Sequence, residues 1–294
     1  MGQTDAVPLR VASDVIHNDI RIIAFDLDGT LLNSSKELSQ ADAESLARAA
    51  AAGVSLVPAT GRAFVALPEV VRSMPFVRYV ITANGAQVLD LREGISVVRA
   101  EIPLPQAIDI LSYFDTLPVI YDCFMDGKAW MTRAFFEKIE DFAPDAHMLK
   151  MLRELRQPVD ELKAFLQEQG RGMQKTQLFT WDDGLRAELL RDLAGRFPGT
   201  VVSSSAVNNV EINNEHANKG EALRRLADYL GVDMARTLAF GDGLNDVSMI
   251  RAAGVGVAMA NASQEVRDAA DFVTLSCDES GVSAGIKKYL KEVF

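Results

Sequence analysis

The chain has 294 residues, of which 48% are hydrophobic and 24% are charged, so it has the length and composition of a globular protein with a substantial core. Its 30 basic and 41 acidic residues give a net charge of −11, which argues against nucleic acid or an anionic membrane as a partner. Two cysteines and three histidines exclude a disulfide framework and argue against a Cys- or His-based metal site.

Targeting signals are not evident in the sequence. No apolar run reaches the roughly 18 residues of a membrane helix. The N-terminus lacks the basic start and long apolar stretch of a secretion signal. We therefore predict a soluble, reduced, cytoplasmic protein, monomeric or homodimeric, and an N-terminal extension over residues 1–19, which show no clear period.

The first regular elements follow this extension. The apolar run 21–25 ends in the polar, glycine-containing segment 26–30, as a buried parallel strand does. Ser39 then opens an alanine-rich helix, with Asp42 three positions later as its capping-box partner, and Gly53 ends it.

A strand–helix–strand rhythm continues along the chain and returns near its end. It predicts parallel pairing with right-handed crossovers. The predicted strands are 54–57, 79–82, 237–240, 255–259 and 272–274, with a helix over 219–230.

The character of the sequence changes after residue 87. Two strand-like runs over 119–132 flank Asp126-Gly127, a strong hairpin signal. Further strands are predicted at 176–181, 201–202 and 210–212, and a helix at 185–197. We therefore predict an α/β core, residues 20–86 and 213–294, interrupted by an inserted α+β module, residues 87–212.

Polar residues cluster where the predicted core strands end. In an open parallel sheet the carboxyl ends of the strands share one edge, and ligands bind there. The residues at these ends are Asp26 and Asp28, Thr60, Asn84, and then Asp242, Asn245 and Asp246.

The carboxylates in this set predict a metal ion. Asp26 and Asp28 are two positions apart, so they leave the same face if strand geometry persists. Asp242 and Asp246 add two more charges, and converging carboxylates repel one another unless a cation or proton lies between them. Without matching His or Cys ligands, the set favours a hard cation, most plausibly Mg²⁺.

A phosphate group fits the remaining polar residues. Lys219 offers a positive charge, Thr60 a hydroxyl, and the amides of Gly61 and Arg62 open a helix. The Arg62 side chain could bind phosphate or pair with an acid. A carboxylate near the phosphate could act as nucleophile, and a second one could protonate the leaving oxygen and later activate water.

Four short motifs together resemble the ordered motifs of the haloacid dehalogenase superfamily: DLDGT at 26–30, TGR at 60–62, KG at 219–220 and GDGLND at 241–246. Only 29 residues separate Thr30 from Thr60, whereas Thr60 and Lys219 are 159 positions apart. The insertion therefore follows the second motif, as in Cof-type phosphatases of class IIB, which carry an α/β cap of the C2B kind. The implied fold is a Rossmann-like parallel-sheet core with an inserted cap domain.

The resemblance also implies a role for each motif residue. Asp26 would be the nucleophile and a Mg²⁺ ligand, and Asp28 the general acid/base with its backbone carbonyl on the metal. Asp242 would bind Mg²⁺ directly, and Asp246 directly or through water. The implied phosphate-binding residues are Thr60, Gly61, Arg62, Asn84, Lys219 and Asn245.

The resulting expectation is a Mg²⁺-dependent phosphatase that hydrolyses small phosphorylated metabolites, such as sugar phosphates or phosphorylated cofactors, through an aspartyl phosphate. A phosphomutase of the same superfamily and a non-catalytic sensor of phosphorylated ligands remain alternatives. A dehalogenase is disfavoured because that chemistry requires neither Asp28 nor Mg²⁺.

Overall fold

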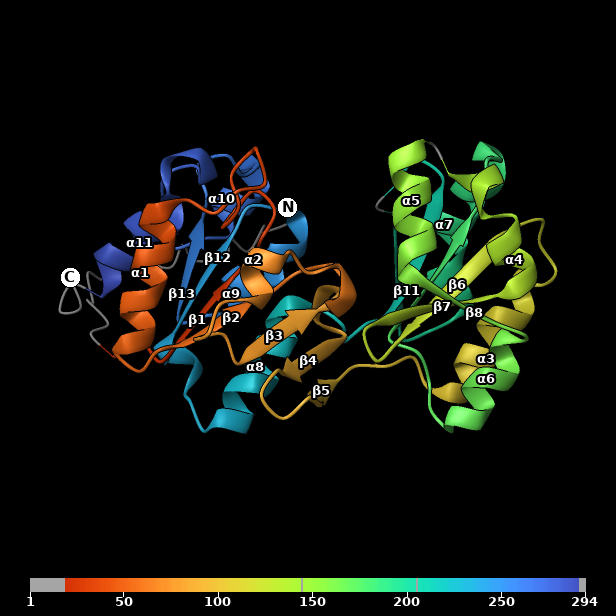
Figure 1. Cartoon of the computed structure of the whole chain (residues 1–294), viewed down its shortest axis with the longest axis horizontal. Helices are drawn as coiled ribbons and strands as arrows, with labels where there is room; N and C mark the ends of the chain where they lie inside the picture. Colours follow the sequence, from red (N-terminus) through yellow and green to blue (C-terminus); the bar gives the residue numbers. More distant parts are fainter. Residues whose placement is uncertain (1–18, 144, 205, 291–294) are drawn as a thin grey trace, which may run out of the picture. The chain divides into compact units, whose positions relative to one another are not determined.

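The structure is a computed structural model that describes residues 19–143, 145–204 and 206–290 (Figure 1). The chain divides into two compact units, the first made of residues 1–56 and 231–294 and the second of residues 57–230. Apart from Asp19, the predicted N-terminal extension lies outside the described residues. Within the described ranges, no helix is both long and apolar enough to cross a membrane.

A five-stranded sheet with the order β14-β13-β12-β1-β2 carries the α/β core. The pairs β1–β12, β12–β13 and β13–β14 are parallel, and all four residues of β1 are buried, as predicted for a strand covered on both faces. The strands are β1 (Ile22–Phe25), β2 (Ser55–Pro58), β12 (Thr237–Gly241), β13 (Val255–Ala258) and β14 (Phe272–Val273).

Helices α1 and α11 lie side by side in the first unit (Figure 1), where the Oγ atoms of Ser45 and Ser283 are 2.7 Å apart. Ser39 begins α1 as predicted, because its hydroxyl accepts the backbone N–H of Asp42. The helical elements here are α1 (Gln40–Ala51), η4 (Met234–Arg236), η5 (Leu244–Asp246), α9 (Val247–Ala252), α10 (Gln264–Asp268), η6 (Cys277–Glu279) and α11 (Gly281–Tyr289).

The strand predicted at 79–82 forms, and its predicted parallel direction is borne out at one bridge. A parallel bridge joins Ala59 to Ile81, and β3 also pairs antiparallel with β4 in a three-stranded sheet β3-β4-β5, which was not predicted. The tight reversal η2 between β3 and β4 causes this pairing. The elements are η1 (Phe64–Ala66), α2 (Glu69–Arg72), β3 (Tyr79–Thr82), η2 (Ala83–Gly85), β4 (Gln87–Asp90) and β5 (Ile95–Arg99).

The remaining strands of the second unit form a six-stranded mixed sheet with the order β10-β11-β9-β6-β7-β8. The predicted hairpin is confirmed, because Met125 pairs with Lys128 and both Asp126 and Gly127 have positive φ angles, 51° and 72°. The strands are β6 (Ile120–Met125), β7 (Lys128–Thr132), β8 (Arg156–Val159), β9 (Lys175–Phe179), β10 (Thr200–Ser203) and β11 (Asn209–Asn214).

The two faces of this sheet are built differently. Tyr121, Leu178 and Val210 belong to a large apolar core that includes residues of α3, α6 and α7. On the other face, Ile120 and Phe179 pack with residues of η3 and α5. The other helical elements of this unit, besides η1, α2 and η2, are α3 (Leu104–Phe114), α4 (Arg133–Glu137), η3 (Ile139–Phe142), α5 (Ala146–Leu155), α6 (Leu162–Gln169), α7 (Asp183–Arg196) and α8 (Lys219–Leu230).

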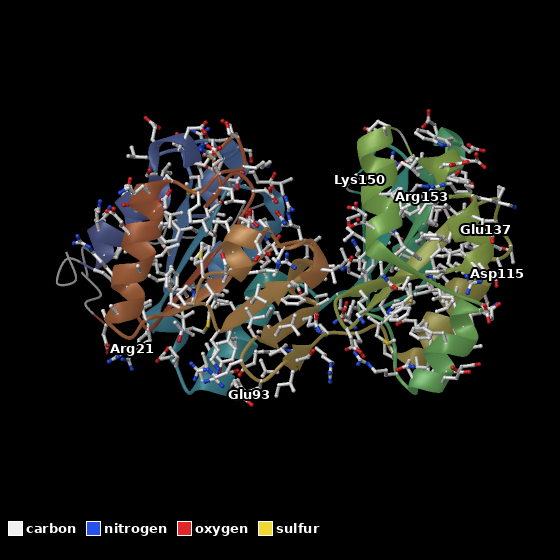
Figure 2. The ribbon with its side chains drawn as sticks, viewed as in Figure 1. Arg21, Glu93, Asp115, Glu137, Lys150 and Arg153 are labelled. Atoms are coloured by element: carbon white, nitrogen blue, oxygen red, sulfur yellow. The ribbon has the colours of Figure 1, made fainter. Side chains whose placement is uncertain are left out.

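Charged side chains of α5 lie on its solvent-exposed side (Figure 2). Arg153 donates to Glu140 over 2.8 Å, and both side chains are about half exposed. Such exposed pairs contribute little to stability. The limits proposed for the insertion, 87 and 212, stay a prediction, since the compact units divide elsewhere along the chain.

Candidate active site

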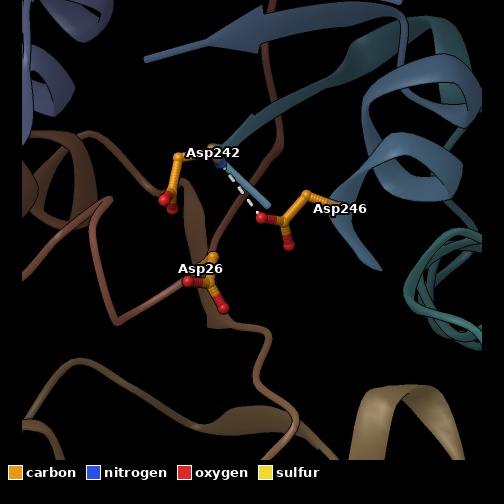
Figure 3. A group of neighbouring side chains, drawn as sticks. All are labelled: Asp26, Asp242 and Asp246. Atoms are coloured by element: carbon orange, nitrogen blue, oxygen red, sulfur yellow. Dashed lines mark hydrogen bonds between the residues drawn. The ribbon is translucent and has the colours of Figure 1, made fainter. Parts of the chain in front are cut away.

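Three carboxylates of the first unit converge at the ends of two neighbouring strands (Figure 3). Asp26 directly follows β1, and Asp242 and Asp246 follow β12, its parallel neighbour. One ligand atom from each of the three lies within 4.8 Å of the other two. The strand pairing extends to the site, because the backbone N–H of Asp26 donates to the carbonyl of Phe240 over 3.0 Å.

The turn after β12 fixes Asp246. Its Oδ2 accepts the backbone N–H groups of Asp242 and Gly243 over 3.0 and 2.9 Å (the first is dashed in Figure 3). Gly241 lies so near that a Cβ there would be 2.3 Å from the Cβ of Asp246. The glycine is therefore required for this close approach, and the amides direct the carboxylate of Asp246 toward the loop that carries Asp242.

The segment after β1 fixes Asp242 from the other side. The Thr30 hydroxyl donates to Asp242 Oδ1 over 2.7 Å. Gly29 has a φ of +86°, and a Cβ there would lie 2.5 Å from Asp242 Oδ2. The carbonyl of Gly29 accepts the Asn261 side-chain amide over 2.8 Å. Gly29 therefore lies directly against the Asp242 carboxylate, and a side chain at position 29 would collide with it.

The donor chemistry of this group fits a hard divalent cation. All three candidate ligands are carboxylate oxygens, which suit Mg²⁺, Ca²⁺ or Mn²⁺ and not the softer metals. Two full charges no more than 4.8 Å apart repel by at least about 3 kcal/mol at an effective dielectric constant of 20. Amide and hydroxyl donors offset part of this repulsion, and a bound cation would offset the rest.

Asp28, the predicted acid/base, lies beside this group in sequence but has a different environment. Its carboxylate forms an ion pair with Lys36, in which Nζ and Oδ1 are 2.9 Å apart. The Asp28 side chain is 33% exposed, whereas Asp26 and Asp246 are buried. The carboxylate of Asp28 is not one of the three grouped ligand atoms, which leaves its predicted backbone-carbonyl contribution untested.

The predicted phosphate-binding residues of the second unit come from three segments. Thr60 is 2% exposed, and its hydroxyl accepts the backbone N–H of Arg62 over 3.2 Å. The backbone N–H of Asn84 donates to the carbonyl of Thr60 over 3.0 Å. The Arg62 side chain donates to the carbonyl of Ala66 over 3.1 Å.

Two glycines, Gly61 and Gly85, lie where these segments come closest to one another. A Cβ on Gly61 would lie 2.8 Å from Asn84 Oδ1. Gly85, with a φ of +102°, lies against the start of α8, where a Cβ would be 2.2 Å from the carbonyl oxygen of Asn218 and 2.9 Å from the Lys219 nitrogen. Lys219 itself is fully buried. The structure therefore brings the TGR segment, Asn84-Gly85 and the first residue of α8 together.

Comparison with known proteins supplies the family. The model of the haloacid dehalogenase-like hydrolases matches residues 23–286. The chain belongs to the haloacid dehalogenase-like hydrolases. Phosphatase YwpJ of Bacillus subtilis is 33% identical over 92% of this chain and 100% of its own length. 5-Amino-6-(5-phospho-D-ribitylamino)uracil phosphatase YcsE of the same organism is 28% identical over 92% and 96%. The enzyme class is accordingly that of a haloacid dehalogenase-type phosphatase.

Solved structures confirm the predicted fold class. TM0651 from Thermotoga maritima superimposes with a TM-score of 0.75, at 29% identity over 92% of this chain and 97% of its own. The subclass IIB sugar phosphatase BT4131 shares the fold with a TM-score of 0.70, at 20% identity over 93% and 100%. The core with a parallel sheet and an inserted mixed-sheet cap is therefore that of the class IIB members of this family.

Three residues around the acidic group were not singled out from the sequence. Thr30 lies within the DLDGT motif, whose threonine could have suggested a hydroxyl donor. Lys36 and Asn261 carry no such signal, because their contacts to Asp28 and Gly29 depend on a tight turn and on a loop from the far end of the chain. The backbone N–H of Cys277 donates to Asn261 Oδ1 over 3.0 Å and so helps to position Asn261. Burial raises the pKa of the Cys277 thiol, and the negative charges of Asp278 and Asp242 raise it further.

Proposed function

We propose that this haloacid dehalogenase-type phosphatase is Mg²⁺-dependent and hydrolyses small phosphorylated metabolites through a phosphoryl group carried on Asp26. The observation that carries the proposal is the convergence of Asp26, Asp242 and Asp246 within 4.8 Å at the ends of paired parallel strands. Three buried or half-buried carboxylates so close together favour a divalent cation, and Asp26 is the one that follows β1 directly.

In the proposed mechanism, an oxygen of Asp26 attacks phosphorus in line while the bond to the leaving oxygen breaks. Asp28 gives its proton to that oxygen and becomes a carboxylate, which then takes a proton from the water that hydrolyses the aspartyl phosphate. Asp26, Asp242 and Asp246 would hold Mg²⁺, with the Asp28 carbonyl completing the protein ligands. When bound, the ion neutralises charge on the phosphoryl oxygens.

The proposed phosphate-binding set is Thr60, Lys219 and Asn84, with the amides of Gly61 and Arg62 and with Asn245. Burial of Lys219 at the first residue of α8 supports this role. A lysine is electrostatically unfavourable at the positive end of a helix, so a nearby anion would explain its position. The hydroxyl of Thr60 would complement the lysine by donating to a phosphoryl oxygen.

The inserted cap, proposed to span residues 87–212, would exclude water from the first step and select the leaving group. The relative YcsE acts on a phosphorylated ribitylamino-uracil, which supports a substrate of comparable size. Sugar phosphates and phosphorylated cofactors are the classes we propose to test first.

Release of inorganic phosphate from a panel of such esters, measured with Mg²⁺ and with EDTA, tests the proposal. We expect Mg²⁺-dependent release by the wild type and its loss in Asp26→Asn, because the nucleophile is removed while the shape is kept. Asp268→Asn is the matched control, since Asp268 is an exposed residue of α10, and it should behave as wild type.

Other outcomes would redirect the assignment. An isomeric phosphate ester in place of free phosphate would identify a phosphomutase. Tight binding of esters without turnover would identify a sensor. Wild-type turnover by Asp26→Asn would remove Asp26 from the mechanism.

A further inference from the structure

Lys36 occupies an unusual backbone conformation close to the acidic site. Its φ angle is +63°, in the left-handed region that side-chain-bearing residues other than Asn and Asp seldom adopt. Held strain of this kind is a reason to look for a function at the residue concerned. The lysine lies at the tip of a short turn between Leu32 and Leu38, which form an antiparallel bridge.

Several hydrogen bonds hold this turn in one conformation. Asn33 Oδ1 accepts the backbone N–H groups of Ser35 and Glu37 over 3.0 and 2.9 Å, and the N–H of Lys36 donates to the carbonyl of Asn33 over 2.9 Å. The N–H of Ser34 donates to Asp278 Oδ1 over 2.9 Å, and this contact lowers the pKa of Asp278. The turn is therefore anchored both locally and to η6.

This anchored turn directs the lysine to Asp28. Lys36 Nζ lies 2.9 Å from Asp28 Oδ1, and the lysine and aspartate side chains are 60% and 33% exposed. An ion pair this exposed contributes little to stability, so it does not by itself explain why a strained lysine is held there. An isolated parallel bridge between Asp28 and Leu32 brings the base of the turn next to the aspartate.

We propose that Lys36 is a positioning residue for Asp28, which holds the carboxyl group by Oδ1 so that Oδ2 exchanges the proton with the leaving oxygen. This inference rests on the proposed function, in which Asp28 is the general acid/base. In the first step, Oδ2–H gives its proton to the leaving oxygen as the bond from Asp26 to phosphorus forms and the bond from phosphorus to that oxygen breaks; the ion pair of Asp28 with Lys36 then corresponds to the carboxylate that results. Lys36 itself exchanges no proton and forms no covalent bond.

A simpler role for the same lysine makes a different prediction. A cation near the site could merely attract the dianionic phosphate, and its removal would then weaken all phosphate esters alike. A positioning role concerns only esters whose leaving oxygen needs a proton. An alkyl phosphate such as glycerol phosphate needs one, whereas 4-nitrophenyl phosphate loses a stable phenolate that leaves without protonation.

The experiment compares kcat/KM for these two esters in Lys36→Met, because kcat/KM reports the steps up to the first irreversible one, phosphoryl transfer to Asp26. General acid catalysis contributes 10²- to 10⁴-fold, and we expect loss of positioning to remove about tenfold or more of it for the alkyl ester. For 4-nitrophenyl phosphate the loss should stay within about threefold. Lys36→Arg keeps a cationic donor and should recover part of the alkyl-ester activity.

Two further variants exclude a collapse of the turn. Lys36→Gly removes the side chain and also relieves the strained φ, so it should fold at least as well as wild type and reproduce the selective loss. Ser35→Ala keeps the N–H that binds Asn33 and should leave both esters unaffected. Equal losses for the two esters in Lys36→Met and Lys36→Gly, or no loss in either, would overturn the inference.

The outcome is separable from the proposed function. If Asp28→Asn shows the same selective loss of the alkyl ester, the acid role of Asp28 holds, and the Lys36 variants then decide the positioning role alone. If Asp28→Asn keeps wild-type kcat/KM for both esters, the proposed function itself fails at Asp28, whatever the Lys36 variants do.

Discussion

Two groups of buried or half-buried carboxylates in this molecule differ in their surroundings. On one face of the six-stranded sheet, Asp122 Oδ2 accepts from the Arg156 guanidinium over 2.9 Å and from Gln177 over 3.0 Å. On the same sheet Lys175 donates to Glu211 over 3.0 Å. We call these five residues the charged network. Each of its two acids has a cation supplied by the protein itself.

The acidic group of the first unit brings together Asp26, Asp242 and Asp246, and neutral donors contact two of these carboxylates: amides contact Asp246 and the Thr30 hydroxyl contacts Asp242. In the charged network each carboxylate lies beside a cation, whereas in the acidic group three carboxylates lie close to one another. Carboxylates held this close together favour a bound cation, which makes the acidic group a candidate ligand site.

The largest effect is expected from Asp246→Asn. Metal-assisted charge stabilisation is worth several kcal/mol, so phosphate release should fall by at least about a thousandfold. Without metal, loss of one repelling charge should stabilise the protein by about 1 to 3 kcal/mol. Urea unfolding with and without Mg²⁺ measures both consequences beside the phosphate assay.

The wild type should respond to Mg²⁺ in the same experiment. A ligand at a hundred times its dissociation constant stabilises the folded state by about 2.7 kcal/mol, and the variant should lose most of this gain. A Mg²⁺ response that survives in Asp246→Asn would remove Asp246 from the ligand set and weaken the contrast between the two groups.

The charged network should behave in the opposite way. Asp122→Asn leaves a buried guanidinium without its counter-charge, which typically costs about 3 to 5 kcal/mol. Asp122 Oδ1 is already buried without a hydrogen-bond partner among the described residues, and burial raises the pKa of this carboxyl. Unfolding by urea should show the loss, while the Mg²⁺ response of the variant stays that of wild type.

A surface pair in the same unit provides the control for this variant. Glu140→Gln breaks the exposed contact to Arg153 and should change stability by less than about 1 kcal/mol. Equal effects of Asp122→Asn and Glu140→Gln would mean that burial does not distinguish the charged network from an ordinary surface ion pair.

A comparison of two glycines separates the effect of backbone strain from the effect of a collision with the acidic group. Gly29 and Gly53 both have a φ of +86°, but a Cβ on Gly29 would lie 2.5 Å from Asp242 Oδ2 and one on Gly53 would meet nothing within 4 Å. Alanine at either position should cost about 1 to 2 kcal/mol of stability. Only Gly29→Ala should also lose activity and Mg²⁺ response, because only it displaces Asp242. Equal activities of the two variants would contradict this.

Much of the acidic group follows from the sequence, because its residues come directly after apolar strands. An apolar run ending in DLDG fixes where Asp26 lies on a strand, and parallel pairing of β1 with β12 then brings Asp242 beside it. Residues 216 positions apart in sequence thus become neighbours through the sheet. This reasoning needs only the hydrophobic pattern and the rule that parallel strands end at one edge.

The antiparallel pairing of β3 with β4 was not predicted, although a signal for it was present in the sequence. Asn-Gly is a strong signal of a tight reversal, and Ala83, Asn84 and Gly85 all have positive φ angles. Asn84 was predicted only as a phosphate-binding residue at the end of a strand, and the role of Asn84-Gly85 in turning the chain back into β4 was not predicted. The Lys36–Asp28 ion pair had no comparable signal, since nothing in NSSKE predicts a left-handed lysine.

The strand order of the five-stranded sheet has a consequence for synthesis on the ribosome. β1 lies between β2, which follows it closely in the chain, and β12, which begins at Thr237. Until β12 emerges, one edge of the buried strand β1 is without its native partner, and exposed strand edges promote aggregation. The six-stranded sheet, completed by residue 214, can fold during this interval. Asp242 and Asp246 are therefore added to Asp26 only in the last fifth of translation. Until then the exposed edge of the apolar strand β1 needs protection from aggregation.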